Sequence, residues 1–527
     1  MKIFSSAAYV ALILLFAGAE HSYGQYEDNP TLPGIPQVDG PLQIQVIYPP
    51  VGSFKPNVRN NFIFGTVGTG DAELTINGDN VPVAGNGAFL GFLTMPKDGV
   101  YTLIAEKQGQ LDTLVFTFSE PDEAPPASPV VRDVFDVPEL GVVAFGADTL
   151  ATGSDIAYGA PTPTADREWF FPQGARFPVL EYRGNHLRID LAGETAWVEK
   201  KYVTVSSETP KSAEVGIDVQ FEEADRWTDV KIPVGYAPFS VKPMNRSLKL
   251  TFYNALSYEL EKKAGSGKRS APSFSVSNPA NSIVGGYNWQ AEKDREVVHL
   301  SIDLRQSLWG FKAFYDEGGR LVLRIRRPKA LNPENPLSGM RIMVDAGHPP
   351  RGATGPTGLT EADANLSIAL ALEKKLKERG ARVIMTRRDT LPLLTDTNVT
   401  MELSARVDLA VERNADILVS VHNNGFSDGV NPFKRNGTET YYYHAFAADL
   451  AQTLHEEILE VTGVPSLGYK GRSLSLIRPT WMPAVLTEAL YMMHPQQEAA
   501  LRDPGFIDRL AEAHVKGIER YIRDRMQ

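Results

Sequence analysis

The chain has 527 residues, of which 22% are charged and 43% hydrophobic, and its formal net charge is −11. This length exceeds what one hydrophobic core supports, so we expect several domains. An acidic balance without a basic run argues against nucleic acid as a partner. The sequence has no cysteine, which excludes disulfides, thiolate zinc sites and a cysteine nucleophile.

The first segment has the features of a secretory signal. Lys2 is followed by a short apolar run and then by small residues. The run is shorter than the ~20 residues that a membrane span needs. We therefore predict a signal peptide over 1–24, with an uncleaved anchor helix as the alternative. The expected product is a secreted protein with no stable membrane insertion. Residues 25–42 are polar and rich in Pro and Gly, which predicts an exposed linker.

Short alternating runs then fill three stretches, 43–122, 130–210 and 211–328. Strands at this spacing, separated by Gly, Asn and Asp turns, predict small all-β modules. The first stretch resembles a bacterial Ig-like β-sandwich. The second ends on Leu187–Val198 and resembles an SH3-like barrel, with Trp197 in its core. The third has Trp309-Gly-Phe before its last strand and resembles an AMIN-like module, which implies envelope protein partners.

Three prolines within 328–336 mark a last linker, and after it the sequence alternates between strand-like and helix-like segments. Apolar runs suited to buried strands alternate with segments of helical periodicity, such as the one that begins at Glu361. Repeated βα units predict an α/β domain over 338–527, with a mainly parallel sheet covered by helices. The predicted fold is thus three small β modules followed by an α/β domain.

Side chains that can bind a metal or transfer a proton lie at the ends of the strand-like segments or at the start of a helix. His348 follows one apolar run, His422 and Glu488 close two others, and Glu361 begins a helix. Open α/β sheets bind their ligands at the carboxyl ends of the strands, so we expect these four side chains to meet. Two imidazoles and a carboxylate can hold zinc with one position open, and Glu488 could then act as the acid/base.

Residues 338–527 resemble the catalytic domain of the zinc-dependent N-acetylmuramoyl-L-alanine amidases of type 3. Val344-Asp-Ala-Gly-His348 matches the family's Asp-Pro-Gly-His strand end, with Ala346 in place of proline. Glu361–Leu366 matches the glutamate-led helix start, and Ser420-Val-His-Asn-Asn424 matches the Ser-Ile-His-Ala-Asn strand end. Leu486–Tyr491 matches the strand that carries the catalytic glutamate. The four motifs occur in the family's order.

The resemblance implies one Zn²⁺ per catalytic domain, held by His348, Glu361 and His422, with Glu488 as acid/base beside a zinc-bound water. It also gives roles to neighbouring residues. Asp345 and Ser420 would hold the ligand histidines in position. Asn424 and Arg387 are candidates for the substrate groove, although a packing role suits Arg387 equally well.

The implied activity is that of a secreted peptidoglycan hydrolase, which cleaves the amide bond between N-acetylmuramic acid and the L-alanine of the stem peptide. Two alternatives stay open: a zinc peptidase acting on peptidoglycan crosslinks, and a non-catalytic wall-binding protein.

Two further histidines have no role in this metal site. His455 begins a zincin-like His-Glu-Glu without its second histidine, so we expect it on a helix surface. Whether His494 reaches the substrate is left open.

Overall fold

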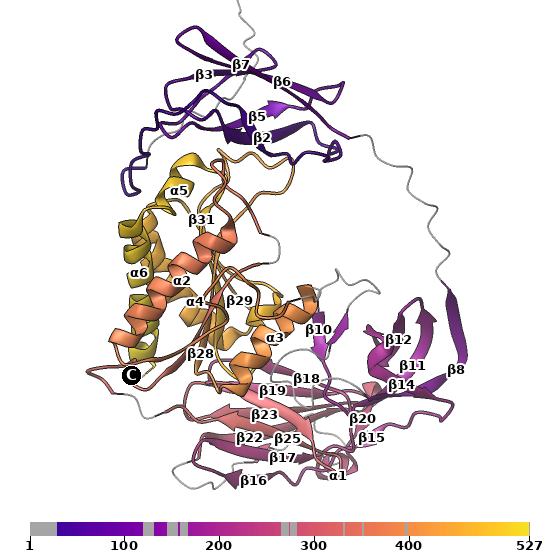
Figure 1. Ribbon diagram of the computed structural model, residues 1–527. Coiled ribbons are helices and arrows are strands. Elements are labelled where there is room, and N and C mark those ends of the chain that lie inside the picture. The colour runs from indigo at the N-terminus through magenta and orange to yellow at the C-terminus, as the bar shows by residue number, and fades with distance from the viewer. Residues whose placement is uncertain are drawn as a thin grey trace, which may run out of the picture.

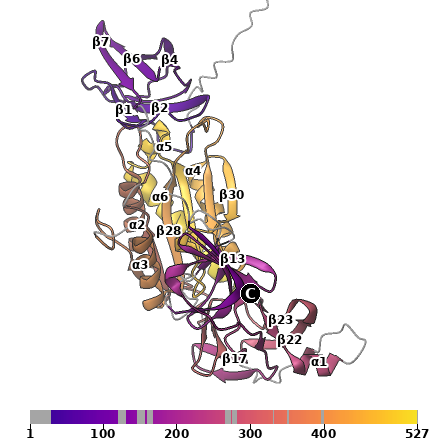
Figure 2. The same ribbon diagram turned by 90° about the vertical axis from the view of Figure 1, so that its right-hand side faces the viewer.

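The computed structural model describes the following residues: 29–119, 131–144, 156–158, 167–264, 273–274, 282–329, 332–349, 352–395 and 399–525. The expected signal, 1–24, lies outside them. An N-terminal β-sandwich covers one end of a central α/β domain, and two further β regions lie at its other end (Figure 1). The same order is visible after a quarter turn (Figure 2). Within the described residues, no helix is both long enough and apolar enough to cross a bilayer.

The N-terminal sandwich consists of two antiparallel sheets around one core. The Asn77-Gly78 turn between two of its strands has positive φ angles of 53° and 85°, as tight hairpin turns of this kind require. The core is apolar and includes Ile63, Phe89 and Tyr101. The three-stranded sheet contains β1 (Gln45–Tyr48), β2 (Asn60–Thr66) and β5 (Ala88–Thr94), and the four-stranded sheet contains β4 (Asp79–Val81), β3 (Glu73–Ile76), β6 (Val100–Lys107) and β7 (Gln110–Thr117).

The described part of the expected linker, 29–42, is irregular and mostly exposed, but two of its residues are anchored on the α/β domain. Leu32 is only 5% exposed and lies in the core of the α/β domain. The Asn29 side chain donates to the Thr462 carbonyl oxygen at 2.9 Å. The Pro and Gly content of this segment thus accompanies an irregular, mostly exposed backbone that Asn29 and Leu32 attach to the α/β domain.

The second and third β regions each have one apolar core. The second is a seven-stranded antiparallel sheet, in the order β10 (Arg167–Phe170), β9 (Ile156–Tyr158), β13 (Glu194–Glu199), β12 (His186–Leu191), β11 (Arg176–Arg183), β8 (Arg132–Val143) and β14 (Val203–Ser206). The third region has a four-stranded sheet of β16 (Gln220–Glu223), β17 (Trp227–Pro233), β25 (Arg320–Arg326) and β24 (Phe311–Tyr315). Its five-stranded sheet contains β18 (Phe239–Pro243), β19 (Ser247–Phe252), β23 (Val297–Leu304), β22 (Val284–Glu292) and β21 (Ser273–Phe274). A short pair of β15 (Ala213–Glu214) and β20 (Ala255–Leu256) and the helix α1 (Tyr258–Ala264) complete the region.

The α/β domain is built on a six-stranded sheet. Its order is β27 (Arg382–Met385), β26 (Arg341–Ala346), β28 (Ile417–Asn424), β31 (Ala484–Tyr491), β29 (Thr438–Tyr442) and β30 (Ser466–Gly471). The β29–β31 pair is antiparallel, and the other pairs are parallel. The carboxyl ends of β26, β28 and β31 therefore lie at one edge of the sheet.

Helices lie on both faces of this sheet because successive strand residues point to opposite sides. Ile342 and Val344 pack with α2, α4 and α6, whereas Met343 and Leu418 pack on the other side with Ala410 of α3. The helices of the domain are α2 (Glu361–Glu378), α3 (Val399–Glu412), α4 (Ala448–Thr462), α5 (Pro495–Ala500) and α6 (Pro504–Asp524).

The third β region joins the α/β domain through a buried polar contact. Arg326 forms an ion pair with Asp416 and donates to the Ala415 carbonyl oxygen at 2.6 Å. Trp309 Nε1 donates to the Asp416 carbonyl oxygen at 3.0 Å. Asp416 also forms an ion pair with Lys329, so two cations from the segment that precedes the α/β domain neutralise this buried carboxylate.

Candidate metal centre and active site

The side chains singled out in the sequence meet at the carboxyl edge of the sheet. His422 on β28 lies opposite Glu488 on β31 in the parallel ladder. His348 follows the neighbouring strand β26 by two residues. Glu361 is the first residue of α2, and the preceding Thr360 caps that helix by accepting a hydrogen bond from the Asp363 N–H at 3.2 Å.

The ligand atoms of His348, Glu361 and His422 all lie within 4.8 Å of one another. Glu361 Oε1 is 3.2 Å from His348 Nε2 and 3.1 Å from His422 Nδ1. Burial acts to raise the pKa of Glu361, but the hydrogen bonds from the two histidines outweigh it and bring the pKa below its ordinary value. The anionic carboxylate and the two imidazoles, which are 25% and 14% exposed, fit the donor set of a zinc site.

Backbone and amide groups hold this cluster in place. Glu361 Oε2 accepts from the Ala353 N–H at 2.9 Å. Asn365 donates both to the Gly347 carbonyl oxygen at 3.2 Å and to Glu361 Oε1 at 3.3 Å. A side chain at Gly347 would place its Cβ 2.3 Å from His422 Nε2, so only glycine fits between the two histidines.

Asp345 and Ser420 lie beneath the histidines on β26 and β28. Ser420 Oγ donates to Asp345 Oδ2 at 2.5 Å, and Arg406 of α3 lies 3.3 Å from Asp345 Oδ1. Burial acts to raise the pKa of Asp345, and the Arg406 charge with the Ser420 hydrogen bond brings it below its ordinary value. Arg406 also donates to the Pro349 carbonyl oxygen at 2.7 Å, so one network ties both histidine-bearing strands together.

The environment of Glu488 raises the proton affinity of its carboxylate. The residue is half-buried, and its Oε2 is inaccessible, without a hydrogen-bond partner among the described residues. Burial raises its pKa well above the ordinary value, and the nearby Glu361 and Glu439 raise it further. A protonated carboxyl can donate to a departing amine and, once ionised, accept a proton in return.

The prediction from sequence missed Glu439 on β29, which lies opposite Glu488 in the ladder. Glu439 is 3% exposed, accepts from Lys470 Nζ at 2.9 Å and from the Tyr441 hydroxyl, and lies 3.5 Å from Asn424 Nδ2. A signal was present, because Thr438-Glu-Thr places a lone carboxylate between β-branched residues of a strand. Glu439 thus lies between the candidate groove residue Asn424 and Glu488.

Arg387 lies behind the metal cluster. It is 6% exposed and donates at 2.9 Å to the carbonyl oxygens of Ala346 and Gly347, and at 2.6 Å to that of Ala362. It thus fastens the β26 end to the start of α2. This is the packing role, and the buried guanidinium does not support a substrate contact.

The two further histidines whose roles were considered from the sequence, His455 and His494, are both buried. His455 is 3% exposed and lies 2.8 Å from Ser466 Oγ, so its predicted place on a helix surface is wrong; it is on the face of α4 that packs against β29 and β30. His494 is 8% exposed and donates to the Pro432 carbonyl oxygen at 2.9 Å. Burial lowers the pKa of His494 to about 4, so this imidazole is neutral at physiological pH.

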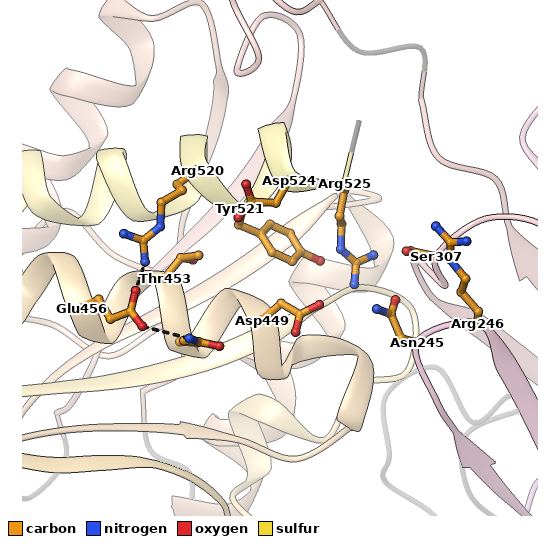
Figure 3. Close-up of a pocket in the computed structure, with 11 residues that line it drawn as sticks. Asn245, Arg246, Ser307, Asp449, Thr453, Glu456, Arg520, Tyr521, Asp524 and Arg525 are labelled. Atoms are coloured by element: carbon orange, nitrogen blue, oxygen red, sulfur yellow. Dashed lines mark hydrogen bonds and ion pairs between the residues drawn. The ribbon is translucent and has the colours of Figure 1, made fainter. Parts of the chain in front are cut away.

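A separate cavity of about 380 Å³ lies between the third β region and helices α4 and α6 (Figure 3). The ion pair between Arg520 and Glu456 lies at one end of it, and Asn245 and Arg246 of the β region lie at the other. None of the candidate metal ligands lines this cavity.

The fold and the site define a class: an α/β domain that carries a His-Glu-His metal-binding cluster at the carboxyl edge of its sheet, with a lone glutamate beside it. The comparisons with known proteins specify the family. A family model described as N-acetylmuramoyl-L-alanine amidase matches residues 342–520. This part of the chain is an N-acetylmuramoyl-L-alanine amidase domain.

Among curated proteins, N-acetylmuramoyl-L-alanine amidase LytC of Bacillus subtilis (strain 168) is 32% identical over 197 residues, or 36% of this chain and 37% of LytC. Probable cell wall amidase LytH of Staphylococcus aureus is 31% identical over 193 residues, or 36% of this chain and 60% of LytH. The match thus spans less than two thirds of either relative.

Solved structures are similar as well. The N-acetylmuramoyl-L-alanine amidase from Clostridium difficile 630 has 29% identity and a TM-score of 0.31, and the match covers 35% of this chain and 97% of that one. The catalytic domain of CwlV from Bacillus (Paenibacillus) polymyxa var. colistinus has 34% identity and a TM-score of 0.30, with 34% and 97% covered.

Proposed function

We propose that the protein is a zinc-dependent peptidoglycan hydrolase, which cleaves the amide bond between N-acetylmuramic acid and the L-alanine of the stem peptide. One observation carries the proposal: the ligand atoms of His348, Glu361 and His422 converge within 4.8 Å, and Glu488 lies opposite His422 in the ladder. The family match over residues 342–520 supports the choice of bond.

In this proposal His348, Glu361 and His422 hold one zinc ion. A bound zinc ion supplies Lewis acidity, which polarises an amide carbonyl and makes water a better nucleophile at neutral pH. Glu488 takes the proton that water loses and delivers it to the departing amine of alanine, so that one carboxyl serves both steps. Asp345, through Ser420 and Arg406, keeps the strands that carry the histidines in register.

We also propose that the protein works outside the cytoplasm, in the periplasm or cell envelope of a bacterium, with peptidoglycan as its substrate. The signal-like residues 1–24 and the cell wall amidases among the relatives support this location. The β regions are proposed to be Ig-like, SH3-like and AMIN-like modules that contact other envelope components. Two packed sheets in the first region and a seven-stranded antiparallel sheet in the second support the first two assignments, and the Trp309-Gly-Phe motif before the last strand supports the third.

The test is digestion of purified peptidoglycan by the full chain, followed by mass spectrometry of the products. We expect free stem peptides that begin with L-alanine and glycan strands with free lactyl carboxyl groups. New amino groups within the crosslinks would instead identify a crosslink peptidase. Intact peptidoglycan with bound protein would identify a wall-binding protein, and measurement of the zinc content would show whether the cluster holds a metal.

A further inference from the structure

The N-terminal sandwich packs on the segments that directly follow two site residues. Phe62 and Phe64 of β2 are 1% and 3% exposed, and they form one apolar cluster with Tyr491 and Met493. Those two residues follow Glu488 by three and five positions. Phe426, four positions after His422, stacks on Tyr491 with ring centroids 4.2 Å apart and lies 6.2 Å from the Phe62 ring. The sandwich therefore contacts the chain next to both sides of the site.

Polar contacts also join the sandwich to the α/β domain next to this apolar cluster. The segment 425–437, which joins β28 to β29 and is called the 425–437 loop here, meets Asn61 of β2. Asn61 Oδ1 accepts from the Gly429 N–H at 3.0 Å, and its Nδ2 donates to Asp428 Oδ1 at 2.7 Å. The Tyr48 hydroxyl also bonds to Asp428. Asn61 is 2% exposed, so a buried side chain of the sandwich holds two loop residues, Asp428 and Gly429, that are themselves exposed.

A second anchor lies on the helices. Asn29 bonds to the end of α4 at Thr462, and its N–H donates to Gln496 of α5 at 2.8 Å. Leu32 enters the core of the α/β domain. The chain then returns to the sandwich, where the Val38 N–H donates to the Gly85 carbonyl oxygen at 2.9 Å. The sandwich lies over α5 in both views (Figures 1 and 2), and its contacts with Asp428 and with α5 hold it at two separate points.

We propose that the sandwich is a fixed part of the catalytic unit: it holds the 425–437 loop against the edge of the metal site and thereby positions the polymeric substrate. This inference rests on the proposed function for the identity of the substrate. The loop begins beside Asn424, and it can bind a glycan strand in one geometry only while the sandwich restrains it. Asn61 and Phe62 are therefore positioning residues, and neither touches the reacting atoms.

The experiment uses full-length variants. Asn61→Ala removes both loop hydrogen bonds without changing the β2 backbone ladder, and Phe62→Ala removes the ring that meets Phe426. Asn80→Ala and Phe54→Ala are matched controls, since Asn80 is exposed on β4 and Phe54 is 56% exposed. Native-state trypsin cleavage after Lys434 and Arg435, mapped by mass spectrometry, reports on the loop and is independent of any activity.

We expect loop cleavage to accelerate roughly tenfold in Asn61→Ala, since two hydrogen bonds restrain the closed loop, and by more in Phe62→Ala. The KM for peptidoglycan should rise severalfold, while kcat and zinc content stay near the wild-type values. The controls should behave like the wild type.

Unchanged loop cleavage and unchanged KM in both variants would overturn the proposal. Joint loss of zinc and kcat in Asn61→Ala would also overturn it, because the sandwich would then only support the fold. A wild-type protein that releases no stem peptide would refute the proposed function instead, and the trypsin result would still report whether the sandwich holds the loop.

Discussion

The α/β domain and the β regions bury different kinds of side chain. In the described β regions the cores are apolar, and the buried charged residues, Glu181, Asp229 and Arg326, each have an ion-pair partner. The α/β domain buries ionisable groups in larger number, including Asp345, Glu361, Arg406, Glu439, His494 and His514. Burying such groups costs free energy unless each is paired. The buried ionisable groups, those of the candidate site among them, are thus concentrated in the α/β domain.

The largest expected effect tests the metal cluster. His348→Ala and His422→Ala each remove one of three protein ligands, so both variants should lose zinc and peptidoglycan hydrolysis together. Metal analysis of the purified variants and a turbidity assay measure the two effects. Full zinc occupancy in either variant would contradict the ligand assignment. A matched change in a β region, His186→Ala, should leave both quantities unchanged.

Glu488→Gln separates the proton transfer from metal binding. The amide keeps the shape of the side chain but cannot carry the proton, and such assistance contributes about 10²–10⁴-fold to the rate. We expect turnover to fall at least roughly a hundredfold with zinc retained. If the variant loses its zinc, Glu488 is a ligand. If turnover stays near normal, another group carries the proton.

Removal of a countercharge should affect the two regions unequally. Arg406→Met leaves Asp345 and Glu402 without their countercharge, and their side chains are 0% and 2% exposed. The free energy of unfolding of the α/β domain should therefore fall by about 3–5 kcal/mol. Arg295→Met in the third β region breaks a pair with Glu194 whose side chains are 54% and 49% exposed, so the expected loss is at most about 1 kcal/mol. Denaturant unfolding of both variants measures the difference, and equal losses would contradict the comparison.

The smallest effect is a pH dependence of the α/β domain. Burial lowers the pKa of His444, His494 and His514 to about 4, below the value near 6.5 of an unfolded chain. The unfolded state therefore binds more protons at mildly acidic pH, and the stability present above pH 6.5 is lost as the pH falls toward 4. From pH 7 to pH 6 the three histidines together should cost roughly 1–2 kcal/mol. Thermal unfolding followed at several pH values measures this slope, and His514→Gln should reduce it.

Local sequence features were sufficient to find the candidate site. Apolar runs ended at Ala346, His422 and Glu488, or close to them, and a capped helix began at Glu361. Ends of parallel strands share one edge of a sheet, so these positions predicted a meeting point without any coordinates. The order of the motifs then indicated the amidase domain. This inference was possible because alternation and capping depend on residues close together in the chain.

The sequence by itself thus determined the succession of β regions and α/β domain and the residues that could bind metal. Only the tertiary structure decided that Arg387 is a buried clamp, that Glu439 lies beside Glu488, and that the sandwich holds the 425–437 loop. The Asn61 to Gly429 hydrogen bond joins residues 368 positions apart. Such contacts depend on how folded domains pack against each other. Local periodicity reports only on neighbouring residues, so it cannot predict which segment a distant domain will contact.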